Sequence, residues 1–298
     1  MLARTRAGLA AARATLRSPV VVVPTMGALH DGHRALLRRA RVLAGRNGSV
    51  VVSVFVNPLQ FGVGEDLDQY PRTLDDDVAV CGLEHVDVVF APSYRQMYPR
   101  EQLIRVSPGP IGALLEGASR PGFFDGVLTV VLKLMHLVRP DIAVFGEKDA
   151  QQLALVRAMA ADLNLPVAID SVPTVRDPDG LATSSRNRYL SDAERKTALA
   201  LCVALEAGAA ASQDGPDAVL AAAGAELAAA GRADPPFAVD YLTLVDPATF
   251  AAVGPEYHGE ALLLVAGTVG TTRLIDNARL SLGAPEPQDG AGRPGAAP

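Results

Sequence analysis

The chain has 298 residues, which is enough for one large domain or two modest ones. Hydrophobic residues make up 49% and charged residues 20% of the sequence, and this composition excludes a disordered protein. The net charge of −6 argues against nucleic acid or an anionic membrane as a partner, and no run of about 18 apolar residues predicts a transmembrane helix. Cys81 and Cys202 lie far apart and predict neither a disulfide framework nor a zinc site, so we expect a cytoplasmic enzyme.

The first 18 residues carry arginines and no acidic residue, a pattern shared by transit peptides and amphipathic helices. Arginines interrupt every apolar run, which argues against a secretory signal. We favour an amphipathic helix that packs on the first strand.

From residue 19 onward, apolar β-branched runs alternate with helical periodicity. The runs that predict buried strands cover residues 20–23, 49–56, 86–90, 141–146 and 167–172. Helices are predicted from about His33, over 124–138 and over 151–163. Continuous apolar strands that alternate with helices are typical of a parallel sheet covered on both faces. We therefore predict a Rossmann-like α/β domain over residues 1–174.

The character of the sequence changes after about residue 175. A polar, turn-rich segment (175–190) leads into an alanine-rich helical stretch at roughly 192–231. Strand-like runs follow at 237–245, 260–266 and 271–282. These features predict a smaller C-terminal α+β domain over 175–282, and the Gly-, Pro- and Ala-rich tail 283–298 predicts disorder.

The strongest functional signal is PTMGALHDGHRALL at residues 24–37, where a strand passes through a glycine-containing turn into a helix. His30 and His33 lie where the helix begins, and the free N–H groups and the helix dipole favour an anion there. Gly27 and Gly32 permit close backbone approach. Metal ligation lacks a third His or Cys nearby, and two core histidines fit poorly on such a turn. The pattern therefore favours phosphate binding.

Further polar residues follow other predicted strands, at the edge where parallel sheets bind ligands. Asn57 and Gln60 are neutral hydrogen-bonding groups suited to a small polar substrate, although loop capping explains their spacing equally well. Lys148 is one of three lysines in the chain and would place a cation beside phosphates; the alternative is a solvated surface lysine. Asp149 offers an acceptor for ribose hydroxyls or a helix cap.

A hydroxyl-rich segment, TSSRN, lies at residues 183–187. Ser184, Ser185 and Arg186 offer hydroxyl, backbone and guanidinium donors to phosphate oxygens. An ordinary loop at the start of a helix explains the same pattern. The acidic run at residues 75–77 is typical of a solvated helix start.

Several motifs together resemble one family. HDGH resembles the HIGH-type signature of nucleotidyltransferases and class I aminoacyl-tRNA synthetases. In its wider context it is similar to the pantothenate synthetase (pantoate–β-alanine ligase) family. The segments that share this similarity are PTMGALHDGH (24–33), FVNPLQF (55–61), YPRTLDDD (70–77), LEGASRPG (115–122), FGEKDAQQL (145–153), DGLATSSRNRYLS (179–191) and VGTTRLIDN (269–277). They occur in order and span nearly the whole chain.

The resemblance implies ATP-dependent condensation of (R)-pantoate with β-alanine, giving pantothenate, AMP and diphosphate through a pantoyl-adenylate, in a homodimer. It implies ATP contacts at Met26, Gly27, Ala28, Leu29, His30, Asp31, Gly32, His33, Gly146, Glu147, Lys148, Asp149, Val175, Thr183, Ser184, Ser185 and Arg186. The implied catalytic groups are His30, His33, Lys148, Ser184, Ser185 and Arg186. The substrate contacts are Asn57, Gln60 and Gln152, and the Mg²⁺ contacts are Asp76 and Asp77.

The sequence departs from the family pattern at three positions. Val80 stands where a glutamine is expected near the Mg²⁺ contacts, Phe123 where many relatives have histidine, and Thr183 where methionine or leucine is usual. Another HIGH-type nucleotidyltransferase that acts on a phosphorylated acceptor is an alternative, although such an acceptor would favour arginines over Asn57 and Gln60. A nucleotide-binding regulator without catalysis is the third hypothesis.

Overall fold

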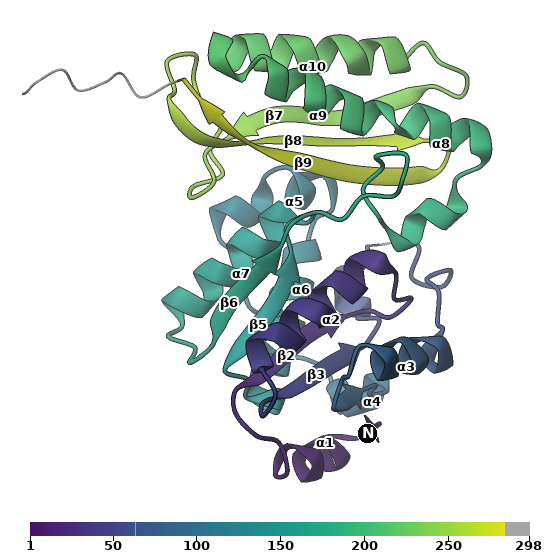
Figure 1. Ribbon diagram of the computed structural model, residues 1–298, viewed down its shortest axis with the longest axis vertical. Helices are drawn as coiled ribbons and strands as arrows, with labels where there is room; N and C mark the ends of the chain where they lie inside the picture. The colour runs from purple at the N-terminus through teal and green to yellow at the C-terminus, as the bar shows by residue number, and fades with distance from the viewer. Residues whose placement is uncertain (63, 284–298) are drawn as a thin grey trace, which may run out of the picture.

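The computed structural model describes residues 1–62 and 64–283, which form two units, each built on a sheet (Figure 1). In the first unit every neighbouring pair of strands is parallel. The strand order is β1 (Leu2–Ala3), β4 (Val88–Phe90), β3 (Ser49–Val54), β2 (Val20–Thr25), β5 (Ile142–Gly146) and β6 (Ala168–Val172). The order reverses between β2 and β5, and such a reversal is where open α/β sheets bind ligands.

Helices cover both faces of this sheet because successive residues of a strand face opposite sides. Val21 and Val23 of β2 pack in one core with α2 (Asp31–Ala44) and α3 (Leu74–Leu83). Val20 and Val22 pack in the opposite core with α1 (Arg6–Arg13), α6 (Phe123–Val138) and α7 (Ala150–Asp162). All four valines are fully buried. The predicted Rossmann-like sheet is therefore confirmed.

The second unit is an antiparallel sheet of β7 (Phe237–Val245), β8 (Gly259–Val269) and β9 (Thr272–Leu282). One face packs against helices; the helices on that side are α8 (Asp192–Ala198), α9 (Ala200–Ala210) and α10 (Pro216–Ala230). On the other face, Leu262 and Leu264 pack with Ala150 and Ala154 of α7. The sheet thus lies between its own helices and the first unit (Figure 1), and the predicted smaller α+β part is confirmed.

Short elements lie in the connections between the longer helices and strands. They are the 3₁₀ turns η1 (Pro58–Gln60), η2 (Pro110–Ala113), η3 (Ser185–Tyr189) and η4 (Ser212–Asp214), and the one-turn helices α4 (Tyr94–Met97) and α5 (Glu116–Ser119). Of these, η1 and η3 carry residues of the site. In the described part of the chain, no helix combines the length and apolar character needed to cross a bilayer.

Two expectations differ from the structure in detail. The N-terminal segment is not one helix, because Leu2 and Ala3 pair with Val89 and Phe90 as an edge strand before α1 begins. The alanine-rich stretch is three helices, and the last break falls at Gly215, whose φ of +93° favours glycine. The disordered tail was predicted for residues 283–298, and residues 284–298 lie outside the described part of the chain. The domain boundary between residues 174 and 175 stays a prediction.

Candidate active site

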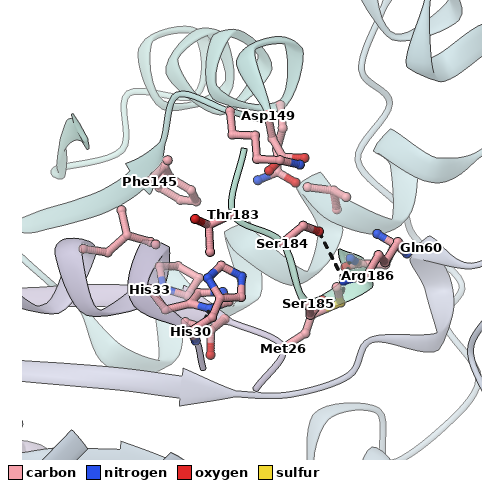
Figure 2. Close-up of a pocket in the computed structure, with 18 of the residues that line it drawn as sticks. Met26, His30, His33, Gln60, Phe145, Asp149, Thr183, Ser184, Ser185 and Arg186 are labelled. Atoms are coloured by element: carbon pink, nitrogen blue, oxygen red, sulfur yellow. Dashed lines mark hydrogen bonds between the residues drawn. The ribbon is translucent and has the colours of Figure 1, made fainter. Parts of the chain in front are cut away.

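A cavity of about 240 Å³ opens at the carboxyl ends of the central parallel strands (Figure 2). Three distant segments meet there: the β2–α2 turn, the β5–α7 turn and the segment that follows β6. The predicted residues that line it are Met26, His30, Gly32, His33, Gln60, Gly146, Lys148, Asp149, Gln152, Val175, Thr183, Ser184, Ser185 and Arg186. Sequence motifs up to 160 residues apart, from Met26 to Arg186, therefore share one cavity.

The β2–α2 turn owes its shape to Gly27 and to Asp77 of α3. Gly27 has φ +86°, and a Cβ there would lie 2.8 Å from Asp77 Oδ2. The N–H of Leu29 donates to Asp77 Oδ1 at 2.8 Å, and that of Ala28 donates to Oδ2 at 3.2 Å. The buried carboxylate thus fixes the turn before the histidines, although it lies at the start of a different helix.

His30 and His33 lie together at the start of α2, with ring centroids 4.0 Å apart. The backbone N–H of His30 donates to Nδ1 of His33 at 3.3 Å. This bond requires an unprotonated Nδ1, so the proton of neutral His33 is on Nε2. Burial lowers the pKa of His30 to about 4, and the charge of Lys148 acts in the same direction. Burial is the main cause that lowers the pKa of His33 to about 3, and the charge of the neighbouring His30 acts in the same direction. Both imidazoles are therefore neutral donors at neutral pH.

Lys148 lies in the turn between β5 and α7 and lines the same cavity as the two histidines. Its positive charge is a second cause, after burial, that lowers the pKa of His30. None of the residues that the structure describes forms an ion pair with Lys148. An ammonium group beside neutral donors makes this end of the cavity suited to an anion.

The segment from Thr183 to Arg186 forms part of the cavity wall (Figure 2). Thr183 donates to Asp177 at 2.6 Å, so this threonine anchors the loop with a hydrogen bond that methionine cannot make. Ser184 Oγ accepts from the N–H of Arg186 at 3.3 Å. Arg186 forms two hydrogen bonds, both of 3.0 Å, with the carboxylate of Asp66. Its guanidinium lines the cavity while held by this ion pair.

Gln60 and Asn57 form a buried amide pair on η1. Asn57 Nδ2 donates to Gln60 Oε1 at 3.1 Å and to Gly126 O at 3.1 Å, while Tyr98 donates to Asn57 Oδ1 at 2.9 Å. A Cβ on Gly126 would collide with Leu59 O, so glycine lets η1 approach α6 this closely. Asn57 is 1% exposed and does not line the cavity. The structure makes it the support of Gln60, in place of the predicted direct contact.

Sequence reasoning missed an apolar wall and an arginine. The wall is formed by side chains of α6 at helical spacing, namely Val127, Val130, Val131 and Leu134. That spacing was visible in the sequence but is also typical of core packing. Arg120 also lines the cavity, with its Cζ 3.7 Å from the centroid of the Phe123 ring. A cation therefore lies over the ring of Phe123, one of the positions at which the sequence was expected to depart from the family pattern.

Five of the predicted ATP contacts do not line the cavity. They are Gly27, Ala28, Leu29, Asp31 and Glu147. Gly27 and Ala28 are buried in the turn that Asp77 holds, Asp31 is exposed, and Glu147 accepts a hydrogen bond from Ser171 at 2.7 Å. These residues shape or flank the site, and the structure gives their side chains no place in the cavity.

The structure does not fit the predicted magnesium ligands. Both oxygens of Asp77 accept N–H groups of the β2–α2 turn, and Asp76 is exposed. Neither residue lines the cavity. Across residues 1–62 and 64–283, no group of three or more His, Cys, Asp or Glu side chains is arranged to hold a metal ion. Asp77 is therefore a structural residue of the turn.

The cavity has the features of a nucleotidyl-transfer site of the HIGH type: a helix start with two neutral histidines, a lysine and a hydroxyl-rich loop. The family model for pantoate–β-alanine ligase matches residues 2–279. Pantothenate synthetase from Thermobifida fusca is 62% identical over 269 residues, covering 88% of this chain and 90% of the relative.

Two solved structures extend the comparison. Pantothenate synthetase from Thermus thermophilus is 47% identical with a TM-score of 0.86, covering 93% of this chain and 98% of its own. Pantoate–β-alanine ligase from Francisella tularensis, complexed with beta-gamma ATP and β-alanine, is 32% identical with a TM-score of 0.75, covering 93% and 97%. The chain belongs to the pantoate–β-alanine ligase family.

Proposed function

We propose that this ligase joins (R)-pantoate to β-alanine through a pantoyl-adenylate made from ATP. In the first step a pantoate carboxylate oxygen attacks the α-phosphorus, and the bond to the β-phosphate oxygen breaks, so diphosphate leaves. In the second step the β-alanine amine attacks the acyl carbon and loses a proton, and AMP leaves. A carboxylate is ionised at neutral pH, so the first step needs alignment and charge stabilisation but no protein nucleophile.

The polar end of the cavity supports binding of the triphosphate. His33 presents an Nε2–H donor and Lys148 an ammonium group, and hydrogen-bond donors placed where negative charge develops stabilise a transition state. Ser184 and Ser185 add hydroxyl groups to the lining of the cavity. Arg186 adds a guanidinium that exchanges its Asp66 partner for phosphate oxygens when the nucleotide binds.

The other end of the cavity supports binding of pantoate. Gln60 and Gln152 offer neutral amides for its hydroxyl and carboxylate oxygens. The side chains of Val130 and Val131 on α6 offer an apolar surface for its two methyl groups. Gln60 is held by Asn57, which fixes the direction of its amide. This pairing of amides with an apolar wall distinguishes the acceptor end from the phosphate end.

The observation that carries the proposal is that Lys148 lines the same cavity as His30 and His33, together with Gln60 and Gln152. Product analysis tests it. The purified chain is incubated with ATP and a panel of acceptors, and products are identified by mass spectrometry. Pantoate with β-alanine must give pantothenate and AMP. A nucleotidylated phosphate acceptor would favour the alternative transferase, and nucleotide binding without turnover would favour a regulator.

We also propose how magnesium is bound, the oligomeric state, the cellular location and the domain bounds. We propose that Mg²⁺ is held by ATP phosphates and water, since the carboxylates at residues 76 and 77 do not supply its ligands. A homodimer is supported by the highly exposed apolar side chains of Leu103 and Ile104, which are 81% and 82% exposed. A cytoplasmic location is supported by the two free, buried cysteines. Residues 1–174 and 175–282 are the proposed domains.

A further inference from the structure

The motif at residues 269–277 runs from the end of β8 through a turn into β9, outside the cavity, and none of the roles above accounts for it. Three of its side chains form polar contacts with residues that precede β7. Arg273 forms an ion pair with Glu116, Asp276 forms one with Arg176, and Asn277 contacts the β5–α7 turn. One strand of the C-terminal sheet therefore contacts the β5–α7 turn of the site through Asn277, and two segments outside the cavity through Arg273 and Asp276.

Asn277 makes the contact closest to the reacting groups. Its Nδ2 donates to the backbone carbonyl of Glu147 at 3.0 Å and to that of Lys148 at 2.8 Å. These carbonyls belong to the turn that carries the Lys148 ammonium into the cavity. A single amide therefore bridges two successive peptide groups at the base of the lysine side chain.

Another side-chain contact of the β5–α7 turn is at Glu147, whose Oε1 accepts a hydrogen bond from Ser171 of β6 at 2.7 Å. Asp149 occupies the N-cap of α7, but its side chain makes no capping hydrogen bond. The N–H of Glu147 donates to Val172 O at 2.9 Å, which holds the start of the turn to β6. Beyond that point, the amide of Asn277 holds the peptide carbonyls on either side of the Lys148 Cα.

Asn277 is itself held in place by its neighbours. Its N–H donates to Asp276 Oδ1 at 2.8 Å, and the fully buried Asp276 accepts two hydrogen bonds from Arg176. Nearer the start of β9, Arg273 donates to both carboxylate oxygens of Glu116. The amide thus extends from a strand that is held to Glu116 of the first unit through Arg273 and to the segment after β6 through Asp276.

We propose that Asn277 is a positioning residue for Lys148: it fixes the turn so that the ammonium lies where the phosphates bind. This inference rests on the proposed role of Lys148 in adenylate formation. Displacement of a reacting group by about 1 Å can lower the rate by up to about 100-fold. Loss of the two amide donors of Asn277 therefore slows adenylate formation, whereas the contacts of Gln60 and Gln152 with pantoate are unchanged.

The test is a double-mutant cycle on the full chain. Asn277→Asp removes both donors at nearly constant size, and Asn277→Ala removes them without adding charge. Single-turnover diphosphate release from ATP and pantoate is measured for each variant, alone and combined with Lys148→Ala. Arg279→Gln, on the same strand and exposed, is the matched control. We expect Asn277→Asp and Asn277→Ala to slow release about 10- to 100-fold, with the control within about 2-fold of the parent chain.

The combined variants decide between positioning and general destabilisation. If Asn277 acts through Lys148, its substitution changes the rate less than about 2-fold once Lys148 is alanine. An undiminished rate in both Asn277 variants, or an equal slowing in both backgrounds, overturns the proposal. If Asn277→Asp does not fold, Asn277→Ala alone completes the cycle. A parent-like rate for Lys148→Ala alone would instead contradict the proposed function, so the two failures are distinguishable.

Discussion

Substitution of Asp77 separates a structural role from magnesium binding. Asp77→Ala removes the acceptor of two N–H groups, those of Ala28 and Leu29, in a region that is closed to water. Each buried donor left without a partner costs about 1–3 kcal/mol. Because the Ala28 bond is long at 3.2 Å, we expect the free energy of unfolding to fall by about 2–4 kcal/mol, the lower half of the summed range.

The assay is urea unfolding in buffer with EDTA and without nucleotide, so that no metal contributes. Asp76→Ala is the matched control, since this neighbouring carboxylate is exposed and we expect a change within about 0.5 kcal/mol. Equal, small effects of the two substitutions in EDTA would refute the reasoning. So would a loss of stability for Asp77→Ala that is present only when magnesium is added, since that is the behaviour of a metal ligand.

The remaining predictions concern charge and position in the cavity. The lowered pKa values of His30 and His33 predict that NMR of the free protein shows no imidazole titration at these sites near pH 6.5. As the pH falls, the unfolded chain binds these protons before the folded protein does. The contribution of the two histidines to the free energy of unfolding is therefore fully present above about pH 7 and is lost as the pH drops below 6.5. Lys148→Ala slows diphosphate release about 100- to 1,000-fold, whereas the exposed Lys196→Ala leaves it unchanged; parent-like release would remove Lys148 from the mechanism. Asn57→Ala raises KM for pantoate about 10-fold through loss of the Gln60 support and leaves KM for ATP unchanged, and equal changes in both constants would count against this role.

Two of the motifs were predictable because each one lies where a buried strand ends. His30 and Lys148 follow apolar runs, and parallel strands present their carboxyl ends at one edge of a sheet, so the sequence alone predicts that these residues lie together. Ser184 lies 12 residues beyond the end of β6, and only the family resemblance placed it at the site. The elements themselves follow from periodicity. Val20 to Val23 is a continuous apolar run because β2 is buried on both faces.

Contacts between distant residues could not be predicted in the same way. Asp77 resembles any acidic residue in the first turn of a helix, and only the packing of α3 beside the β2–α2 turn shows which N–H groups it binds. The guanidinium of Arg120 stacks on the ring of Phe123, and no spacing in the sequence indicates this contact. The apolar wall of α6 has the same pattern as a core helix. Such roles depend on tertiary contacts that a local pattern does not contain.

In the proposed reaction, the cavity activates pantoate with ATP before β-alanine takes part. Rapid-quench measurement of diphosphate release from ATP and pantoate, in the absence of β-alanine, tests this directly. The account predicts a burst approaching one diphosphate per chain, dependent on pantoate, with a pantoyl-adenylate detectable in the quenched sample. Release that begins only after β-alanine is added would contradict it.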